Sequence, residues 1–355
     1  LFRSGYDVYW GEVLLSIAAI IICGLVCILG KRLAAGLQIL FAFLLLGGVI
    51  SCTFAVSKVS GSMAPAFSPD AGLPFRQIFT IVALSPWAFV GFESVSNSAA
   101  GFRFSPKKTI WIFVAALIAG AFAYIALTQI AISAIPAEYG DWSEYTAEIG
   151  ALGGLKGLPT FFAANAAMGQ MGVVVLGVAT FAAIMTGLIG NFIAASRLLY
   201  TMSEDGILPK WFGKLNRDAS PQNALLFLMG ISLFIPFLGR TAIGWIVDVN
   251  TVGATIAYAY TSAAAYASAR RNGDKRIQVT GIAGLVMSAV FFLYFMSWSA
   301  GAMSTESYLI LAIWGLLGFV LFRCLFESDH TRRLGRSTVV WIALLFLVFL
   351  STMMW

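Results

Sequence analysis

The chain contains about ten stretches of roughly 20 apolar residues, and this recurrence constrains its fold more than any other feature. A stretch of that length can cross the hydrocarbon of a bilayer as a helix, in which the backbone polar groups bond to one another. None of the stretches shows the alternating pattern of barrel strands. The sequence therefore predicts an all-α membrane protein, a polytopic helical bundle of about ten spans. The predicted spans are 12–30, 33–56, 76–99, 109–135, 171–202, 223–239, 243–269, 278–300, 307–326 and 338–355.

The composition excludes an ordinary soluble fold. Of the 355 residues 60% are hydrophobic and only 11% are charged, against about a quarter charged in soluble domains. Segments such as 112–126 and 172–195 are rich in Gly and Ala, and small residues let helix backbones approach closely. We expect these segments to pack in the interior of the bundle.

Basic residues are distributed unevenly between alternate loops. Seventeen of the 22 Lys and Arg residues fall in one set, which includes the loops 101–108, 203–222, 270–277 and 323–337. The other five are Arg3, Lys58, Arg76, Lys156 and Arg240. Cytoplasmic loops carry the excess of basic residues, so the first set is predicted to be cytoplasmic and 136–170 to lie outside the cell membrane. This bias explains the net charge of +6 without a nucleic-acid partner.

No motif for catalysis, nucleotide binding or metal binding stands out. The four cysteines (Cys23, Cys27, Cys52 and Cys324) lie in apolar runs without enough further ligands for a metal site. His330, the single histidine, falls in a basic loop, and no Walker motif is present. We therefore expect neither an enzyme nor a bound cofactor.

Glu93 is the carboxylate that lies deepest in a predicted span. Pro86 cannot donate a helical hydrogen bond, and Gly91 lowers the cost of leaving the helix. Such an interruption is typical of the discontinuous helices of transporters, although a Pro-kinked helix with a paired Glu93 fits equally well. A buried carboxylate with a raised pKa could exchange protons, which makes Glu93 a candidate for proton coupling.

Three segments resemble the amino acid–polyamine–organocation (APC) superfamily of permeases. The run PWAFVGFESVSNSAAGFRFSPKK at 86–108 resembles its sixth helix and following loop. The run SRLLYTMSEDGILPKWFGKLNRDASPQNA at 196–224 is similar to the end of its eighth helix and the next loop, and IAYAYTSAAAYASAR at 256–270 is similar to its tenth helix. The order and spacing of the family are kept, so the resemblance covers nearly the whole chain.

The resemblance implies a LeuT-like inverted-repeat fold that is truncated at its N-terminus. The first three helices of the family would precede Leu1. Residues 1–73 would then form the end of the first repeat, 74–270 the second repeat and 271–355 the C-terminal helices, together a single transmembrane permease domain. An additional span follows the twelfth helix.

The resemblance also implies a substrate site. The substrate amine would meet backbone carbonyls of the unwound helix 76–99, and Trp87 or Phe89 would close over it. Met185 and Asn250 would lie near the pocket, although Met185 fits plain packing and Asn250 a helix contact. A Met at that position offers no cation–π face, which favours a neutral or apolar amino acid. The predicted substrate-binding residues are Trp87, Ala88, Phe89, Val90, Gly91, Glu93, Met185 and Asn250.

The predicted function is secondary active transport of amino acids across the cytoplasmic membrane by alternating access. The alternative is a permease-like amino acid sensor domain of a larger signalling protein. The expected partners are an amino acid substrate and the lipid bilayer. The sequence leaves open whether H+ or Na+ is the coupling ion, and it leaves the oligomeric state open.

Overall fold

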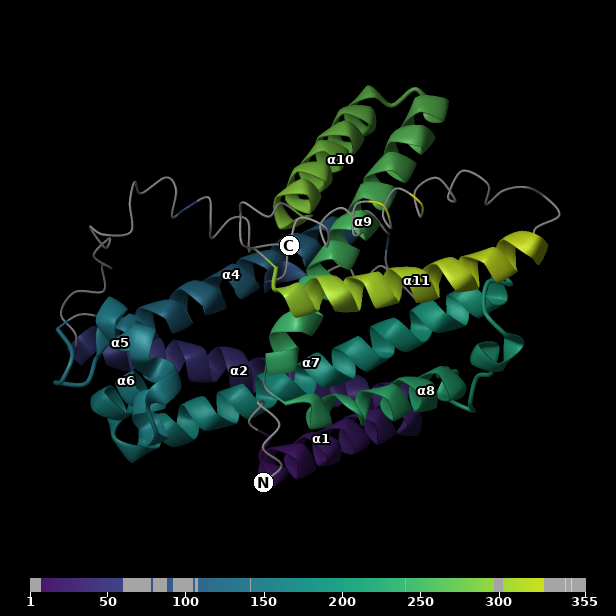
Figure 1. The fold of residues 1–355 in the computed structure, drawn as a ribbon. Helices are drawn as coiled ribbons and strands as arrows, with labels where there is room; N and C mark the ends of the chain where they lie inside the picture. The colour runs from purple at the N-terminus through teal and green to yellow at the C-terminus, as the bar shows by residue number, and fades with distance from the viewer. Residues whose placement is uncertain are drawn as a thin grey trace. The chain divides into compact units, whose positions relative to one another are not determined.

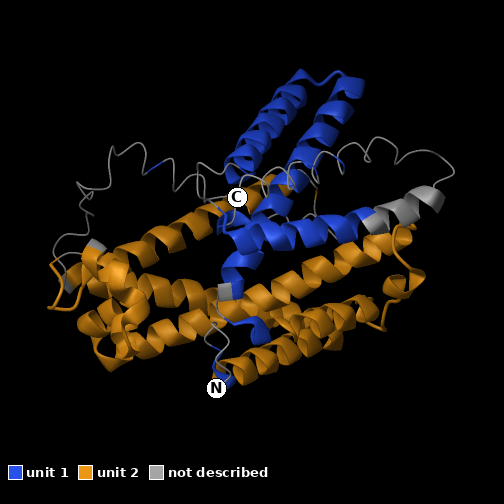
Figure 2. Cartoon of the chain, in the orientation of Figure 1, with its two compact units in different colours: residues 1–10, 75–90, 236–355 blue, residues 11–74, 91–235 orange. Residues whose placement is uncertain are grey.

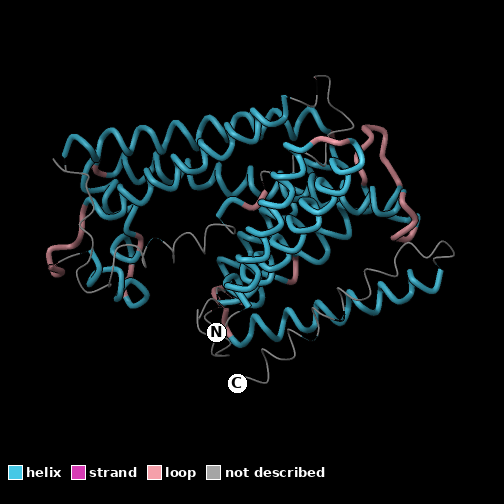
Figure 3. The backbone as a smooth tube through the Cα atoms, turned by 90° about the horizontal axis from the view of Figure 1, so that it is seen from above, coloured by secondary structure: helices cyan, strands magenta, loops and turns pink. Residues whose placement is uncertain are grey.

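Within the described part of the chain every regular element is a helix, and no strand occurs there (Figure 1 and Figure 3). This confirms the predicted all-α class. The computed structural model describes residues 8–59, 78, 88–91, 105, 108–140, 142–239, 241–296, 303–328, 342 and 346.

The helices fall into a long and a short set. The long helices are α1 (Trp10–Leu29), α2 (Lys31–Val59), α4 (Thr109–Ser133), α7 (Gln170–Glu204), α9 (Thr241–Asn272), α10 (Lys275–Met296) and α11 (Thr305–Ser328). The short helices are α5 (Trp142–Glu148), η4 (Ile149–Ala151), η5 (Gly154–Gly157), α6 (Pro159–Met168), η6 (Lys210–Gly213), α8 (Gln222–Ser232) and η7 (Ile235–Leu238).

Six of the described helices are long and apolar enough to cross a membrane, namely α1, α2, α4, α7, α9 and α10. Each overlaps a span predicted from the sequence. The helix α11 covers the predicted span 307–326. The predicted spans 76–99 and 338–355 lie almost wholly outside the described residues.

The predicted span 223–239 is helical over most of its length, but it is not one continuous α-helix. The helix α8 ends at Ser232, and the short helix η7 follows at Ile235–Leu238. Pro236 in η7 has no N–H group to continue an α-helical ladder, which explains the interruption. Long apolar composition therefore does not ensure one unbroken helix here.

The chain divides into two compact units, each with buried apolar clusters of its own (Figure 2). Unit 2 comprises residues 11–74 and 91–235. Unit 1 comprises residues 1–10, 75–90 and 236–355.

In unit 2, α2 and α7 run antiparallel. Early in α2, Gln38 Nε2 lies 3.4 Å from the position that a Cβ would take on Gly190. Later in α2, a Cβ on Gly48 would lie 2.6 Å from Ala179 Cβ, so advancing along α2 means retreating along α7. Opposite directions are what the predicted topology requires of these two spans.

The helices α1 and α7 run parallel. Cys23 Sγ donates a long hydrogen bond to the Met185 carbonyl at 3.9 Å, and four residues further on Cys27 Sγ donates to the Ile189 carbonyl at 3.8 Å. The predicted topology sends both helices toward the cytoplasm. The structure is thus consistent with the alternation derived from basic residues.

The segment 136–170 is more ordered than the long loop that the sequence predicts. It contains α5, η4, η5 and α6, and Pro159 occupies the first turn of α6, where its missing N–H costs nothing. The buried Tyr145 donates its hydroxyl to the Lys156 carbonyl at 2.5 Å. Lys156 in turn forms an ion pair with Glu138. These contacts fold the segment onto itself.

In unit 1, α9 and α10 form a helical hairpin. Gly273 has φ +71°, and the next residue, Asp274, accepts backbone N–H groups of Arg276 and Ile277 at the start of α10. A Cβ on Gly281 would lie 3.0 Å from the Ser262 carbonyl of α9, so the two backbones approach closely. Glycine makes that approach sterically open.

Candidate functional site

The predicted helix break falls on the short described segment Ala88–Gly91. Ala88 and Phe89 are helical, Val90 and Gly91 form a turn, and all four are half-buried. Gly91 has φ +116°, a conformation that L-residues with a side chain rarely adopt. The backbone therefore departs from the right-handed helical conformation at Gly91. Trp87 and Glu93 lie outside the described residues.

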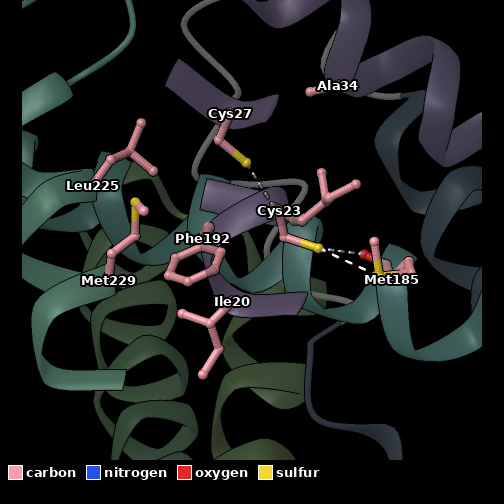
Figure 4. Close-up of a cluster of buried hydrophobic side chains, with 9 residues drawn as sticks. Ile20, Cys23, Cys27, Ala34, Met185, Phe192, Leu225 and Met229 are labelled. Atoms are coloured by element: carbon pink, nitrogen blue, oxygen red, sulfur yellow. Dashed lines mark hydrogen bonds between the residues drawn. The ribbon is translucent and has the colours of Figure 1, made fainter. Parts of the chain in front are cut away.

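Met185 lies on α7 in the apolar core of unit 2, with 7% of its surface exposed. Its Sδ atom is 3.7 Å from Cys23 Sγ of α1, and Figure 4 shows the two side chains pointing toward each other. The same cluster contains Phe192 from α7 and Met229 from α8. These contacts supply the packing role that the sequence left open for Met185, and a role in substrate binding stays a prediction.

Asn250 lies on α9 in unit 1 and is exposed. Its neighbour Thr251 is buried and donates its hydroxyl to the Val247 carbonyl of the same helix. The predicted site residues thus come from both units, with Met185 in unit 2 and Asn250 in unit 1. For both residues a role in substrate binding stays a prediction.

Asp248 forms a polar contact inside unit 1 that the sequence does not predict. Its carboxylate is half-buried and accepts a hydrogen bond of 2.6 Å from Ser307 Oγ of α11. Ser304 Oγ lies 2.8 Å from Ser307 Oγ and accepts the Ser307 N–H group. The sequence signal was the pair of serines at the start of an apolar helix, a pattern typical of N-caps.

A second feature missed by the sequence analysis is a cavity in unit 2 with a volume of about 260 Å³. Two basic side chains, Lys31 and Arg197, line it together with Gln38 and two serines, Ser196 and Ser220. The signal that could have located it is the predicted clustering of both basic residues on the cytoplasmic side.

The described residues contain no group of three or more His, Cys, Asp and Glu side chains placed to hold a metal ion. Cys23, Cys27 and Cys52 are buried free thiols.

The long apolar helices and their alternating directions in unit 2 define the class: a multi-pass helical membrane protein. The family model for "Amino acid permease" matches residues 4–303. The chain belongs to this family, which confirms the resemblance drawn from the motifs at 86–108 and 196–224. The family consists of transporters and not enzymes.

A curated relative gives a more particular comparison. The chain is 25% identical over 272 residues to the branched-chain amino acid permease BcaP of Lactococcus lactis subsp. cremoris (strain MG1363). The match covers 73% of this chain and 53% of the relative. The chain thus spans about half the length of the relative that it matches.

Proposed function

We propose that the protein is a secondary active transporter that moves amino acids across the cytoplasmic membrane by alternating access. Membership of the amino acid permease family supports this proposal, as do the six helices long enough to span a bilayer. The antiparallel packing of α2 on α7 supports the alternating topology that the mechanism needs.

The proposed substrates are neutral, apolar amino acids of the branched-chain type. The printed name of the Lactococcus relative assigns branched-chain amino acids to that protein. The setting of Met185 among Cys23 and Phe192 is apolar, which favours an aliphatic side chain over a charged one if substrate reaches this part of α7.

The proposed binding element is the interrupted helix at Trp87–Gly91. The observation that carries this proposal is the φ angle of +116° at Gly91, because a backbone that leaves the helix frees carbonyl groups that can accept a substrate ammonium. Glu93 follows two residues later and is the proposed proton-coupling group.

Substitution of Gly91 tests the binding element. Gly91→Ala places a side chain on a left-handed backbone, at a cost of about 1–3 kcal/mol, although nothing lies within 4 Å of the new Cβ. We expect leucine uptake by the full-length protein in proteoliposomes to fall about tenfold or more, while arginine uptake is low in both proteins.

Gly187→Ala is the matched control, because Gly187 lies in α7 with ordinary helical φ and an equally open Cβ position. It should retain normal uptake. Unchanged uptake in Gly91→Ala contradicts the assignment of the binding element. Leucine binding without uptake in the wild-type protein favours the sensor alternative.

Glu93→Gln tests proton coupling, since it keeps the size and hydrogen bonding of the side chain but removes its titration. We expect normal insertion with loss of uptake or loss of its pH dependence between about pH 5 and 8. Uptake that keeps the wild-type pH profile would remove Glu93 from the mechanism.

The proposed sidedness is testable by cysteine labelling in intact cells. Lys214→Cys and Arg271→Cys fall in loops proposed to be cytoplasmic, and Glu144→Cys falls in the segment proposed to lie outside. The three substituted side chains are exposed. An impermeant maleimide should label only Glu144→Cys, and labelling of Lys214→Cys without lysis contradicts the proposed orientation.

A further inference from the structure

The cavity in unit 2 lies where four helix ends meet. Its lining comes from the end of α1, the start of α2, the last third of α7 and the start of α8. Its apolar wall includes Cys27, Ala34 and Leu225, which belong to the buried cluster drawn in Figure 4. Asn216 fixes this corner, because its Nδ2 atom donates to the Ile28 carbonyl of α1 at 2.9 Å.

The lining carries two positive charges and no acid. Lys31, the first residue of α2, is exposed, and Arg197 on α7 is half-buried. The carboxylate of Asp218 approaches this corner from the loop, with its Oδ2 atom 3.5 Å from the position of a Cβ on Gly30. Arg32 and Arg217 add further positive charge beside Lys31 and Asp218. The cavity is therefore suited to an anion.

Two kinds of uncharged hydrogen-bond donor also lie at the cavity. Ser220 lines the cavity and is only 4% exposed, and its hydroxyl has no hydrogen-bond partner in the described part of the chain. Its backbone N–H group is already engaged with Asn216 Oδ1 at 2.9 Å. Pro221, also in the lining, is the N-cap of α8 and leaves the first turn of that helix without a side-chain cap. Uncapped N–H groups at a helix start attract anions.

We propose that this cavity binds a phosphate group, with Lys31 and Arg197 as its charged ligands and the Ser220 hydroxyl as a donor. At about 260 Å³ it is slightly smaller than the pockets of about 300–1,000 Å³ that hold drug-sized molecules, which fits a headgroup or a free ion. Basic cavities between membrane helices near the cytoplasmic surface bind anionic lipid headgroups, and free phosphate offers the same chemistry.

Thermal unfolding of the purified full-length protein distinguishes the two sources. The midpoint is measured against increasing phosphatidylglycerol, phosphatidylcholine or inorganic phosphate, because a ligand that binds the folded state raises the midpoint with its concentration. We expect phosphatidylglycerol to raise it and phosphatidylcholine to leave it unchanged. A rise with inorganic phosphate alone identifies a soluble anion as the occupant.

Variants test whether the rise in the unfolding midpoint depends on the cavity. Lys31→Gln or Arg197→Gln should weaken the apparent affinity about fivefold, and the double variant about twenty-five-fold. The control Lys275→Gln/Arg276→Gln removes two exposed charges at the start of α10 in unit 1 and should keep the wild-type response.

Ala35→Leu tests the cavity without changing charge, because Ala35 is an exposed lining residue whose enlargement fills the space. It should abolish the response while the protein stays folded, which keeps the test decisive if the double variant does not fold. A full response in Ala35→Leu, or no response of the wild-type protein to either phosphate source, overturns the proposal.

Discussion

Two helix contacts, α2 with α7 inside unit 2 and α9 with α11 inside unit 1, depend on different chemistry. In unit 2, α2 meets α7 through Gly48 and Ala179, and α1 meets α7 through the sulfur atoms of Cys23 and Met185. In unit 1, α9 is joined to α11 by the hydrogen bond from Ser307 to the Asp248 carboxylate. In lipid, apolar helices gain little by touching one another, so close packing of small residues and interhelical hydrogen bonds must hold them together.

The comparison shows which kind of substitution should destabilise each contact most. Contacts such as Gly48–Ala179 tolerate a change of polarity better than a change of size, because two backbones already lie as close as sterics permit. The contact between Asp248 and Ser307 tolerates a change of size better than the loss of a partner, since a half-buried carboxylate would lose one of its donors.

The largest effect is expected for Gly48→Leu. A Cβ at this position would already lie 2.6 Å from Ala179 Cβ and 3.3 Å from the Val175 carbonyl. We expect a loss of about 3 kcal/mol in stability, visible as a lower midpoint of thermal unfolding. Gly47→Leu is the control, because a Cβ on the adjacent Gly47 meets nothing within 4 Å and should change stability by less than about 1 kcal/mol. Equal midpoints for the two variants would show that α2 does not pack on α7 through Gly48.

Ser307→Ala should have the next largest effect. It removes the donor at 2.6 Å from Asp248, and hydrogen bonds to charged groups contribute about 1.5–3 kcal/mol. We expect a loss of about 2 kcal/mol. Ser288→Ala is the control in the same unit, because the buried Ser288 hydroxyl donates only to the Gly284 carbonyl of its own helix.

Asp248→Asn separates charge from hydrogen bonding at the same contact, and a double-mutant cycle with Ser307→Ala measures the coupling. A coupling below about 0.5 kcal/mol is the result that contradicts an energetic role for this contact.

The sequence predicted the membrane helices well and their contacts poorly. The length of an apolar stretch is a local property of the sequence, so spans such as 12–30 and 109–135 could be predicted directly. The positive φ angle of Gly91 is likewise consistent with the residue type at that position. Within 223–239, hydropathy averages over Pro236 and so does not show where α8 ends and η7 begins.

The interhelical contacts depend on long-range register, which one sequence does not display. Nothing near Asp248 in the sequence points to Ser307, and nothing near Lys31 points to Arg197. Met185 shows the same limit, since the family resemblance placed it near a pocket, whereas its contact with Cys23 could be seen only in the fold.

A smaller effect is expected for Asn216→Ala, which removes a polar contact between α1 and the loop before α8. Asn216 donates to the Ile28 carbonyl, and its Oδ1 atom accepts the N–H groups of Asp218 and Ser220. We expect a loss of about 1.5 kcal/mol and faster hydrogen exchange confined to 28–33 and 214–221. Asn216→Asp keeps the acceptor but loses the donor, so it should accelerate exchange near Ile28 more than within the loop. Unchanged exchange at both segments in Asn216→Ala is the contrary result.

The smallest effect concerns the folded segment 136–170 and its tyrosines. Burial raises the pKa of Tyr145, and burial together with the hydrogen bond to Glu148 raises the pKa of Tyr139. Both groups are therefore harder to ionise in the folded state than in the unfolded state, where the pKa is about 10. Their contribution to stability is complete below about pH 10 and is lost as the pH rises through the folded pKa values.

Hydrogen exchange of 136–168 should accordingly stay constant up to about pH 10, once corrected for its intrinsic rate, and accelerate above it. Tyr145→Phe removes the bond to the Lys156 carbonyl and should cost about 1 kcal/mol at neutral pH, while it weakens the alkaline acceleration. Tyr139→Phe removes the hydrogen bond to Glu148 and should change the neutral stability less, because the Glu148 carboxylate is exposed and can bond to water instead. An alkaline transition of the same size in wild type and in the double variant would assign it to groups other than these two tyrosines.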